Sequence, residues 1–207
     1  MTNLVNLAVI YYSATGTGTQ IATEIARAAE AMGAQVRVRK VAELAPQSVI
    51  DSNPAWAAHH AATADVPVPS PEDLVWADAV IFGSPTRFGN ISSQLKQYFD
   101  TLSPLWQQGE LADKAYSGFT STGTRHGGHE STLLAMYNSI HHFGGIIVPP
   151  GYTDPVKFVD GNPYGTSHHA VWGPDLGSID DDTRNAARHQ AERTVKVARA
   201  LKQGYVA

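Results

Sequence analysis

Apolar residues along this chain mark five segments that have the pattern of β-strands. Residues 4–12 form a nearly continuous apolar run, which predicts a strand buried on both faces. Residues 34–41 alternate strictly between apolar and polar, which predicts a strand near the edge of a sheet. Segments 77–83, 115–122 and 146–150 predict the three remaining strands, the fourth of them from a weaker pattern.

Between these segments, apolar residues recur at the spacing of a helix face. This spacing predicts four helices, at 21–32, 91–102 with Asn90 as the N-cap, 133–140 and 180–201. Residues 45–75 and 151–179 show no clear period and are predicted to be irregular, the first with room for one short helix. The alternation of strand and helix predicts one α/β domain, residues 1–207, with a doubly wound, five-stranded parallel sheet and helices on both faces.

Composition narrows the classes of protein. The 207 residues are 43% hydrophobic and carry a net charge of −4 without any run of lysine or arginine, which argues against a nucleic-acid partner. Cysteine is absent, which excludes disulfides, thiolate metal sites and a cysteine nucleophile. The chain shows no signal peptide and no apolar run of membrane-spanning length, so we expect a cytoplasmic protein without a membrane span.

Three loops rich in glycine, serine and threonine follow predicted strands, at residues 13–19, 83–90 and 121–129. In doubly wound parallel sheets, ligands bind outside the carboxyl ends of the strands. Because all three loops fall at that edge, they form the strongest indication of a binding site in this sequence.

The first loop, SATGTGT, offers backbone N–H groups, hydroxyls and the positive end of a helix dipole, a combination that suits a phosphate. It lacks the lysine of a Walker A loop, and Ile21 stands where the dinucleotide fingerprint needs its third glycine. What remains is a hydroxyl-lined cradle for a terminal phosphate monoester, without a cation. The alternative is a threonine N-cap beside flexible glycines.

The second loop, FGSPTRFGN, has the composition of a site for a flat heteroaromatic ring. Its glycines let the backbone approach a ligand closely, and Pro85 stiffens the turn, so the amides of residues 86–88 can face the polar edge of a ring. Arg87 would stabilise negative charge on that edge or form a surface ion pair. Phe88 would flank the ring or pack inside the loop.

Several motifs together resemble the WrbA family, which comprises FMN-dependent NAD(P)H:quinone oxidoreductases with a flavodoxin-like fold. They are YYSATGTG at 11–18, FGSPTRFGN at 82–90, LW at 105–106, STGT at 121–124 and NPYGT at 162–166. The resemblance covers essentially the whole chain, and GSPTRFGN and GNPYGT are its most specific parts.

The resemblance implies FMN as the cofactor and a set of residues that hold it. These are Ser13, Ala14, Thr15, Gly16, Thr17 and Gly18 for the phosphate, Thr86, Arg87 and Phe88 for the isoalloxazine ring, and Ser121, Thr122, Gly123, Thr124, Gly127 and Gly128 along the ribityl chain and ring. The third loop is one residue longer than the common version and carries Arg125-His126, so the contact within 125–128 stays open.

The resemblance also implies a catalytic histidine beside the flavin, which maps to His142, with His141 as the alternative. Trp106 and Tyr164 would bind the substrate, a planar quinone. Other histidines keep no recognisable metal-ligand spacing, and we predict no metal site.

The implied activity is ping-pong, two-electron reduction of quinones by NADH or NADPH. Similar proteins are tetramers, so we expect a homotetramer in which Trp106 and Tyr164 complete a neighbour's pocket. The alternative function is that of a flavodoxin-type one-electron carrier, which the modest net charge disfavours. A flavin-free scaffold with the same fold is a third possibility.

Overall fold

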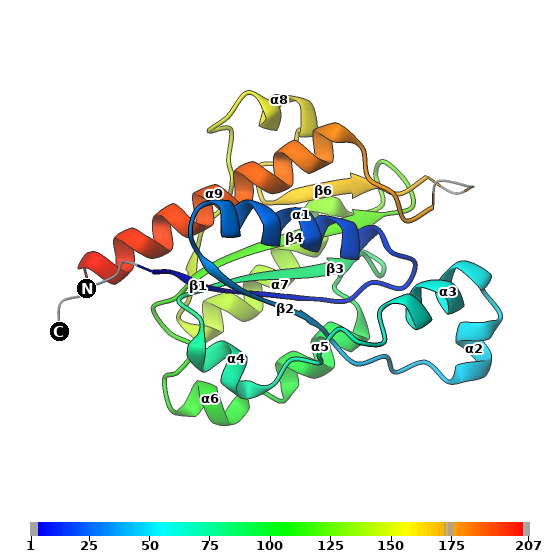
Figure 1. Ribbon diagram of the computed structural model, residues 1–207, viewed down its shortest axis with the longest axis horizontal. Coiled ribbons are helices and arrows are strands. Elements are labelled where there is room, and N and C mark those ends of the chain that lie inside the picture. The colour runs from blue at the N-terminus through cyan, green and yellow to red at the C-terminus, as the bar shows by residue number, and fades with distance from the viewer. Residues whose placement is uncertain (1–3, 172, 174–175, 205–207) are drawn as a thin grey trace.

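Parallel strands in the order β2-β1-β3-β4-β5 form the centre of the computed structural model, and a further strand, β6, pairs with β4 (Figure 1). The strands are β1 (Asn6–Tyr11), β2 (Gln35–Lys40), β3 (Ala79–Pro85), β4 (Ala115–Thr122), β5 (Ile146–Ile147) and β6 (Thr166–His169). The structure describes residues 4–171, 173 and 176–204. All strand pairs are parallel, which confirms the predicted sheet but with six strands instead of five.

The extra strand arises because the fifth strand is interrupted. β5 pairs with the first two residues of β4, and β6 pairs with the last four. The predicted strand 146–150 stops at Ile147, since Pro149 and Pro150 lack the N–H that a strand ladder needs. The segment 151–179 was predicted to be irregular. This prediction is wrong in part, because the segment contains the short polar strand β6.

Helices cover both faces of the sheet, as predicted. They are α1 (Thr17–Ala31), α2 (Gln47–Asp51), α3 (Pro54–Ala62), α4 (Pro71–Trp76), α5 (Ser93–Asp100), α6 (Ser103–Gln107), α7 (His129–Phe143), α8 (Val156–Asp160) and α9 (Asp181–Gly204). One hydrophobic cluster joins the sheet to α1 and α9, and a second joins its other face to α4, α5 and α7. None of the helices in the described residues is long and apolar enough to cross a membrane.

Residues 45–76 hold three short helices, where the sequence predicted an irregular connection with room for one short helix. Asn53 caps α3, its side-chain oxygen accepting from the backbone N–H of Ala55 and Trp56, and Ser70 begins a capping box at α4. These helices are too short to show a clear apolar period. In Figure 1, α2 and α3 stand beyond the carboxyl ends of the strands.

The predicted N-cap of the second long helix is also corrected. Ser92, not Asn90, precedes α5, and its hydroxyl accepts from the backbone N–H of Leu95. Asn90 instead closes a tight turn, in which Arg87 N donates to Asn90 O (2.7 Å) and Asn90 N donates to Arg87 O (3.1 Å). This turn fixes the shape of the second glycine-rich loop.

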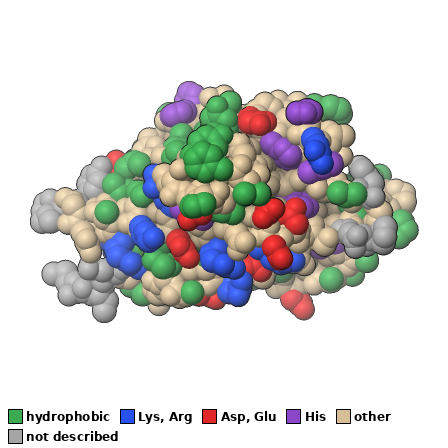
Figure 2. Space-filling model, turned by 90° about the horizontal axis from the view of Figure 1, so that it is seen from above, with side chains coloured by type: hydrophobic (Ala, Val, Ile, Leu, Met, Phe, Trp, Pro, Cys, Tyr) green, Lys and Arg blue, Asp and Glu red, His purple; other side chains and the backbone are tan. Residues whose placement is uncertain are grey.

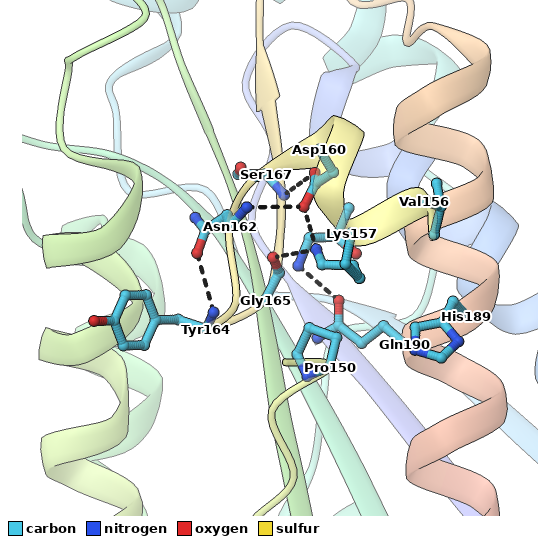
Figure 3. A network of polar contacts seen from close by, with 12 residues as sticks. Pro150, Val156, Lys157, Asp160, Asn162, Tyr164, Gly165, Ser167, His189 and Gln190 are labelled. Atoms are coloured by element: carbon cyan, nitrogen blue, oxygen red, sulfur yellow. Dashed lines mark hydrogen bonds and ion pairs between the residues drawn. The ribbon is translucent and has the colours of Figure 1, made fainter. Parts of the chain in front are cut away.

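A buried ion pair anchors the segment between β5 and β6 (Figure 3). Lys157 Nζ pairs with Asp160 and donates to Gly165 O (3.1 Å), and both charged side chains are almost fully buried, at 0% and 2% exposed. Asp160 also accepts from the backbone N–H groups of Asn162 and Ser167. The pair therefore holds α8 to the chain that enters β6. Burial raises the pKa of Asp160 and lowers that of Lys157, because it disfavours both charged forms.

The outer surface of this segment is apolar. The rings of Tyr152 and Phe158 contact each other at an interplanar angle of 34°, with centroids 5.0 Å apart, and Val159 is also exposed. Figure 2 looks onto this side of the molecule and shows hydrophobic side chains gathered there.

Candidate functional site

The three glycine-rich loops meet around one cavity of about 250 Å³ at the carboxyl ends of β1, β3 and β4. The cavity is lined by Ser13, Ala14, Thr15, Thr17 and Gly18 from the first loop, Pro85, Thr86 and Arg87 from the second, Ser121, Thr122 and Gly123 from the third, and Asn53, Trp56, Ala170 and Leu176 from elsewhere. Five residues that the resemblance also implied are not among the lining residues: Gly16, Phe88, Thr124, Gly127 and Gly128.

The first loop has the features of an anion site. Gly16 takes a φ of +110°, its N–H donates to Ser13 Oγ (3.1 Å), and α1 begins at the next residue without an acidic side chain in its first turn. Thr17 is 4% exposed, and its hydroxyl has no hydrogen-bond partner among the described residues. The first N–H groups of α1 have no intrahelical partner either. A negatively charged hydrogen-bond acceptor in this loop would bind both the Thr17 hydroxyl and these N–H groups.

In the second loop, two of the three backbone amides that we expected to face a ligand donate to backbone carbonyls of the protein instead. Thr86 N donates to Ser121 O (2.8 Å), and Arg87 N donates to Asn90 O. The Arg87 guanidinium donates to Thr86 O (2.9 Å) and pairs with no carboxylate among the described residues, so it forms no surface ion pair there. The loop therefore presents a cationic side chain more than a row of N–H donors.

Phe88 does not pack inside this loop. Its side chain is fully exposed, and its backbone has a φ of +53°, in the left-handed region that non-glycine residues rarely adopt. A large apolar side chain held in water in a strained conformation is costly unless something covers it.

The second and third loops are joined through Thr86. Its hydroxyl accepts from Thr132 Oγ1 (2.8 Å) and from Gly89 N (3.1 Å), and it donates to Gly127 O (3.3 Å). A Cβ atom at Gly128, whose φ is +99°, would lie 3.0 Å from Gly89 Cα. Glycine is needed there because the two loops touch, so Gly127 and Gly128 act in loop packing and lie outside the lining.

His142 and Trp106 lie near the amino ends of the strands, on the side of the sheet opposite to the cavity. Helix α7 begins beside the cavity and runs for 15 residues, about 22 Å, before it ends next to His142. There Trp106 of α6 donates from Nε1 to His142 O (2.8 Å), and the residue is 53% exposed. In Figure 1, α6 lies at the lower left of the molecule and α3 at its right. Within one chain, the structure does not bring His142, its alternative His141 or Trp106 to the cavity.

Tyr164 also lies outside the cavity lining. It precedes β6, and its carbonyl accepts from the Tyr137 hydroxyl of α7 (2.5 Å). Its ring points toward α7, away from the Lys157–Asp160 pair (Figure 3). The strand β6 separates it from Ala170, which does line the cavity.

Helix α3 supplies a wall of the cavity that sequence analysis missed. Trp56 lines the cavity, and its Nε1 donates to Glu43 (3.1 Å), which also accepts from the Tyr12 hydroxyl (2.8 Å) and from Gln94 (2.8 Å). These bonds, with two from backbone amides, outweigh burial and lower the pKa of Glu43, so it stays charged. The Asn-Pro sequence that begins α3 was the available signal.

His59 of α3 contacts the first loop directly. Its Nδ1 lies 3.0 Å from Ala14 O and its Nε2 lies 2.8 Å from Thr19 Oγ1. Burial and the nearby positive charge of Lys40 lower the pKa of His59 to about 4. Among the described residues, no group of three or more histidines or carboxylates is arranged to hold a metal ion.

The sequence of this chain is similar to those of known proteins. Residues 5–154 match the family described as NADPH-dependent FMN reductase. The chain is 47% identical over 202 residues to NAD(P)H dehydrogenase (quinone) of Deinococcus radiodurans, covering 97% of this chain and 99% of the other. It is 36% identical over 206 residues to the protein of the same name from Aromatoleum aromaticum, covering 96% and 98%.

Solved structures share the fold. A WrbA-like flavodoxin from Agrobacterium tumefaciens superposes with a TM-score of 0.62 at 22% identity, covering 95% of this chain and 98% of that one. A flavodoxin from Megasphaera elsdenii gives 0.56 at 17% identity, covering 92% and 98%. At these identities the likeness establishes a flavodoxin-like fold alone.

Proposed function

The chain belongs to the NADPH-dependent FMN reductase family, and from this premise we propose that it is an FMN-dependent NAD(P)H dehydrogenase that reduces quinones. Relatives that match nearly end to end carry that activity in their names. The observation that carries the proposal is the cavity itself, in which three loops from three parallel strands converge at the N-terminus of α1.

The residues of the first loop fit the phosphate of FMN. The unpartnered Thr17 hydroxyl and the first N–H groups of α1 donate hydrogen bonds, and Ser13 keeps the loop in shape through Gly16 N. None of the described residues that line the cavity is a carboxylate that would repel a dianion. Residues 85–87 and 121–123, with Trp56 opposite, would hold the ribityl chain and the ring.

Bound FMN supplies a carrier that accepts a hydride from a nicotinamide and delivers two electrons to a quinone. The chain binds and orients this carrier and leaves one side open for substrates. The guanidinium of Arg87, which has no carboxylate partner among the described residues, stabilises negative charge at the lip of the cavity. NAD(P)H and quinone use the same open side in turn, which gives ping-pong kinetics.

The direct test uses the purified chain. We expect FMN to bind and NADH or NADPH to be oxidised at a rate that depends on added benzoquinone, measured from the absorbance of the nicotinamide. Binding of FMN without oxidation of either nucleotide would favour the one-electron carrier. No change in FMN fluorescence on titration would remove the cofactor from the proposal.

We further propose that the active form is a homotetramer with shared sites. Trp106 and His142 are joined by a hydrogen bond and cannot reach the cavity of their own chain, while the exposed Phe88 at the cavity edge lacks a cover. A neighbouring subunit that brings Trp106 and His142 over the cavity, with Tyr164 nearby, would bury these aromatic surfaces and narrow the slot for a planar quinone.

Trp106→Ala should lower kcat/KM for benzoquinone by roughly 2- to 10-fold and leave FMN affinity unchanged, because ring stacking is lost while the phosphate cradle is intact. Steady-state rates and FMN titration measure the two effects. Phe158→Ala, which removes another exposed aromatic ring, is the matched control and should change neither. Mass photometry across dilution reports assembly, and a monomer with full activity per bound FMN would contradict the shared site.

A further inference from the structure

Two basic side chains lie behind the first loop, although the loop itself contains none. His59 contacts both ends of the turn, at Ala14 O and Thr19 Oγ1, and a Cβ atom at Gly16 would come within 3.5 Å of its ring. Lys40, the last residue of β2, lies close enough to His59 for its charge to lower the pKa of that histidine. Lys40 belongs to β2 and His59 to α3, and both follow the loop by 20 residues or more in the sequence.

The hydrogen bonds of His59 allow the ring to change charge without moving. A carbonyl oxygen only accepts, so Nδ1 carries a hydrogen and donates to Ala14 O. In the neutral ring, Nε2 accepts from the Thr19 hydroxyl. In the protonated ring, Nε2 donates to the oxygen of the same hydroxyl, which accepts equally well. Both protonation states therefore fit one arrangement of heavy atoms.

Among the charged groups that act on His59, Lys40 has the largest effect. Lys40 is buried, donates to Thr63 Oγ1 (2.5 Å) and forms no ion pair with a carboxylate among the described residues. Glu43 acts on Lys40 only through space, since its oxygens are bonded to other donors. His60 exerts a second, weaker effect that lowers the pKa of His59. The Tyr11 hydroxyl of β1 forms a hydrogen bond with Thr19.

We propose that His59 is the cation of this phosphate site: it takes up a proton from solvent when a phosphate monoester dianion occupies the first loop. The ester is FMN if the proposed function holds, and the inference rests on that function to this extent. His59 is a positioning residue, because it acts on the ligand through the loop backbone and through its charge.

The sign of the pH dependence follows from linkage. An anion at about 4–6 Å favours the charged form and raises the pKa of the imidazole by ~1–3 units. A group whose pKa rises on binding strengthens binding fully below its value in the free protein, here about 4, and the gain is lost as pH rises through the bound value. A rise of ~2 units places that loss near pH 6.

The test compares proton uptake in two variants. FMN is titrated calorimetrically at pH 6 in two buffers of different ionisation enthalpy, with the wild-type chain and with His59→Gln, which keeps an amide donor and acceptor but cannot be charged. We expect the wild type to take up ~0.5 proton per FMN more than His59→Gln. Protons released by the phosphate itself cancel in this difference. His60→Gln, one residue along α3, is the matched control and should keep the extra proton uptake, because the effect of His60 on His59 is weaker than that of Lys40.

The affinity ratio gives a second readout that loss of loop order alone would not produce. The FMN affinity of the wild type relative to His59→Gln should fall about tenfold from pH 5 to pH 8. Riboflavin, which lacks the phosphate, should show neither effect. Equal proton uptake by the two chains, or a ratio independent of pH, would overturn the inference while FMN binding still stood. Failure of the wild type to bind FMN would instead overturn the proposed function.

Discussion

Thr17→Val lowers the affinity for FMN by roughly 10- to 100-fold and leaves the affinity for riboflavin nearly unchanged. The Thr17 side chain is buried, and its hydroxyl has no partner among the described residues. In the proposed complex it donates to the phosphate, and a hydrogen bond to a charged acceptor is stronger than one between neutral groups. Fluorescence titration with the two flavins measures both affinities.

The matched control for this variant is Thr23→Val. Thr23 lies on the same helix one turn beyond Thr19, is exposed, and donates to Thr19 O within α1. It should lower neither affinity. Thr19 itself is unsuitable as the phosphate probe because its hydroxyl contacts His59. Equal losses of FMN and riboflavin affinity for Thr17→Val would place the phosphate elsewhere.

Lys157→Met lowers the free energy of unfolding by ~3–5 kcal/mol, the largest stability effect that we expect in this chain. The substitution leaves the Asp160 carboxylate buried without its cation, since both side chains are enclosed beside the entry to β6. Chemical denaturation of the whole chain measures the loss. Because β6 leads to Ala170 at the cavity wall, FMN affinity should fall together with stability.

A double variant separates the ion pair from mere packing. Lys157→Met combined with Asp160→Asn removes both charges, so it should recover a large part of the lost stability. A double variant that is less stable than Lys157→Met alone would show that Asp160 is held mainly by its bonds to Asn162 N and Ser167 N.

The sequence by itself determined the frame of this protein. Long elements such as β1, α1 and α9 repeat their apolar residues over many positions, so burial leaves a readable period in the chain. Parallel strands place their carboxyl ends at one side of the sheet. This rule alone predicts, from the sequence, that the three distant loops lie close together. The motifs of those loops were also enough to suggest the cofactor.

Tertiary structure alone decided which side chains complete the site. The strand β6 has four polar residues and draws its register from β4, so no local period could reveal it. The orientation of α7 removed His142 from the cavity of its own chain. The first loop contains no basic residue, yet His59, 40 residues after Thr19, lies against it through a contact that folding creates and sequence spacing does not encode.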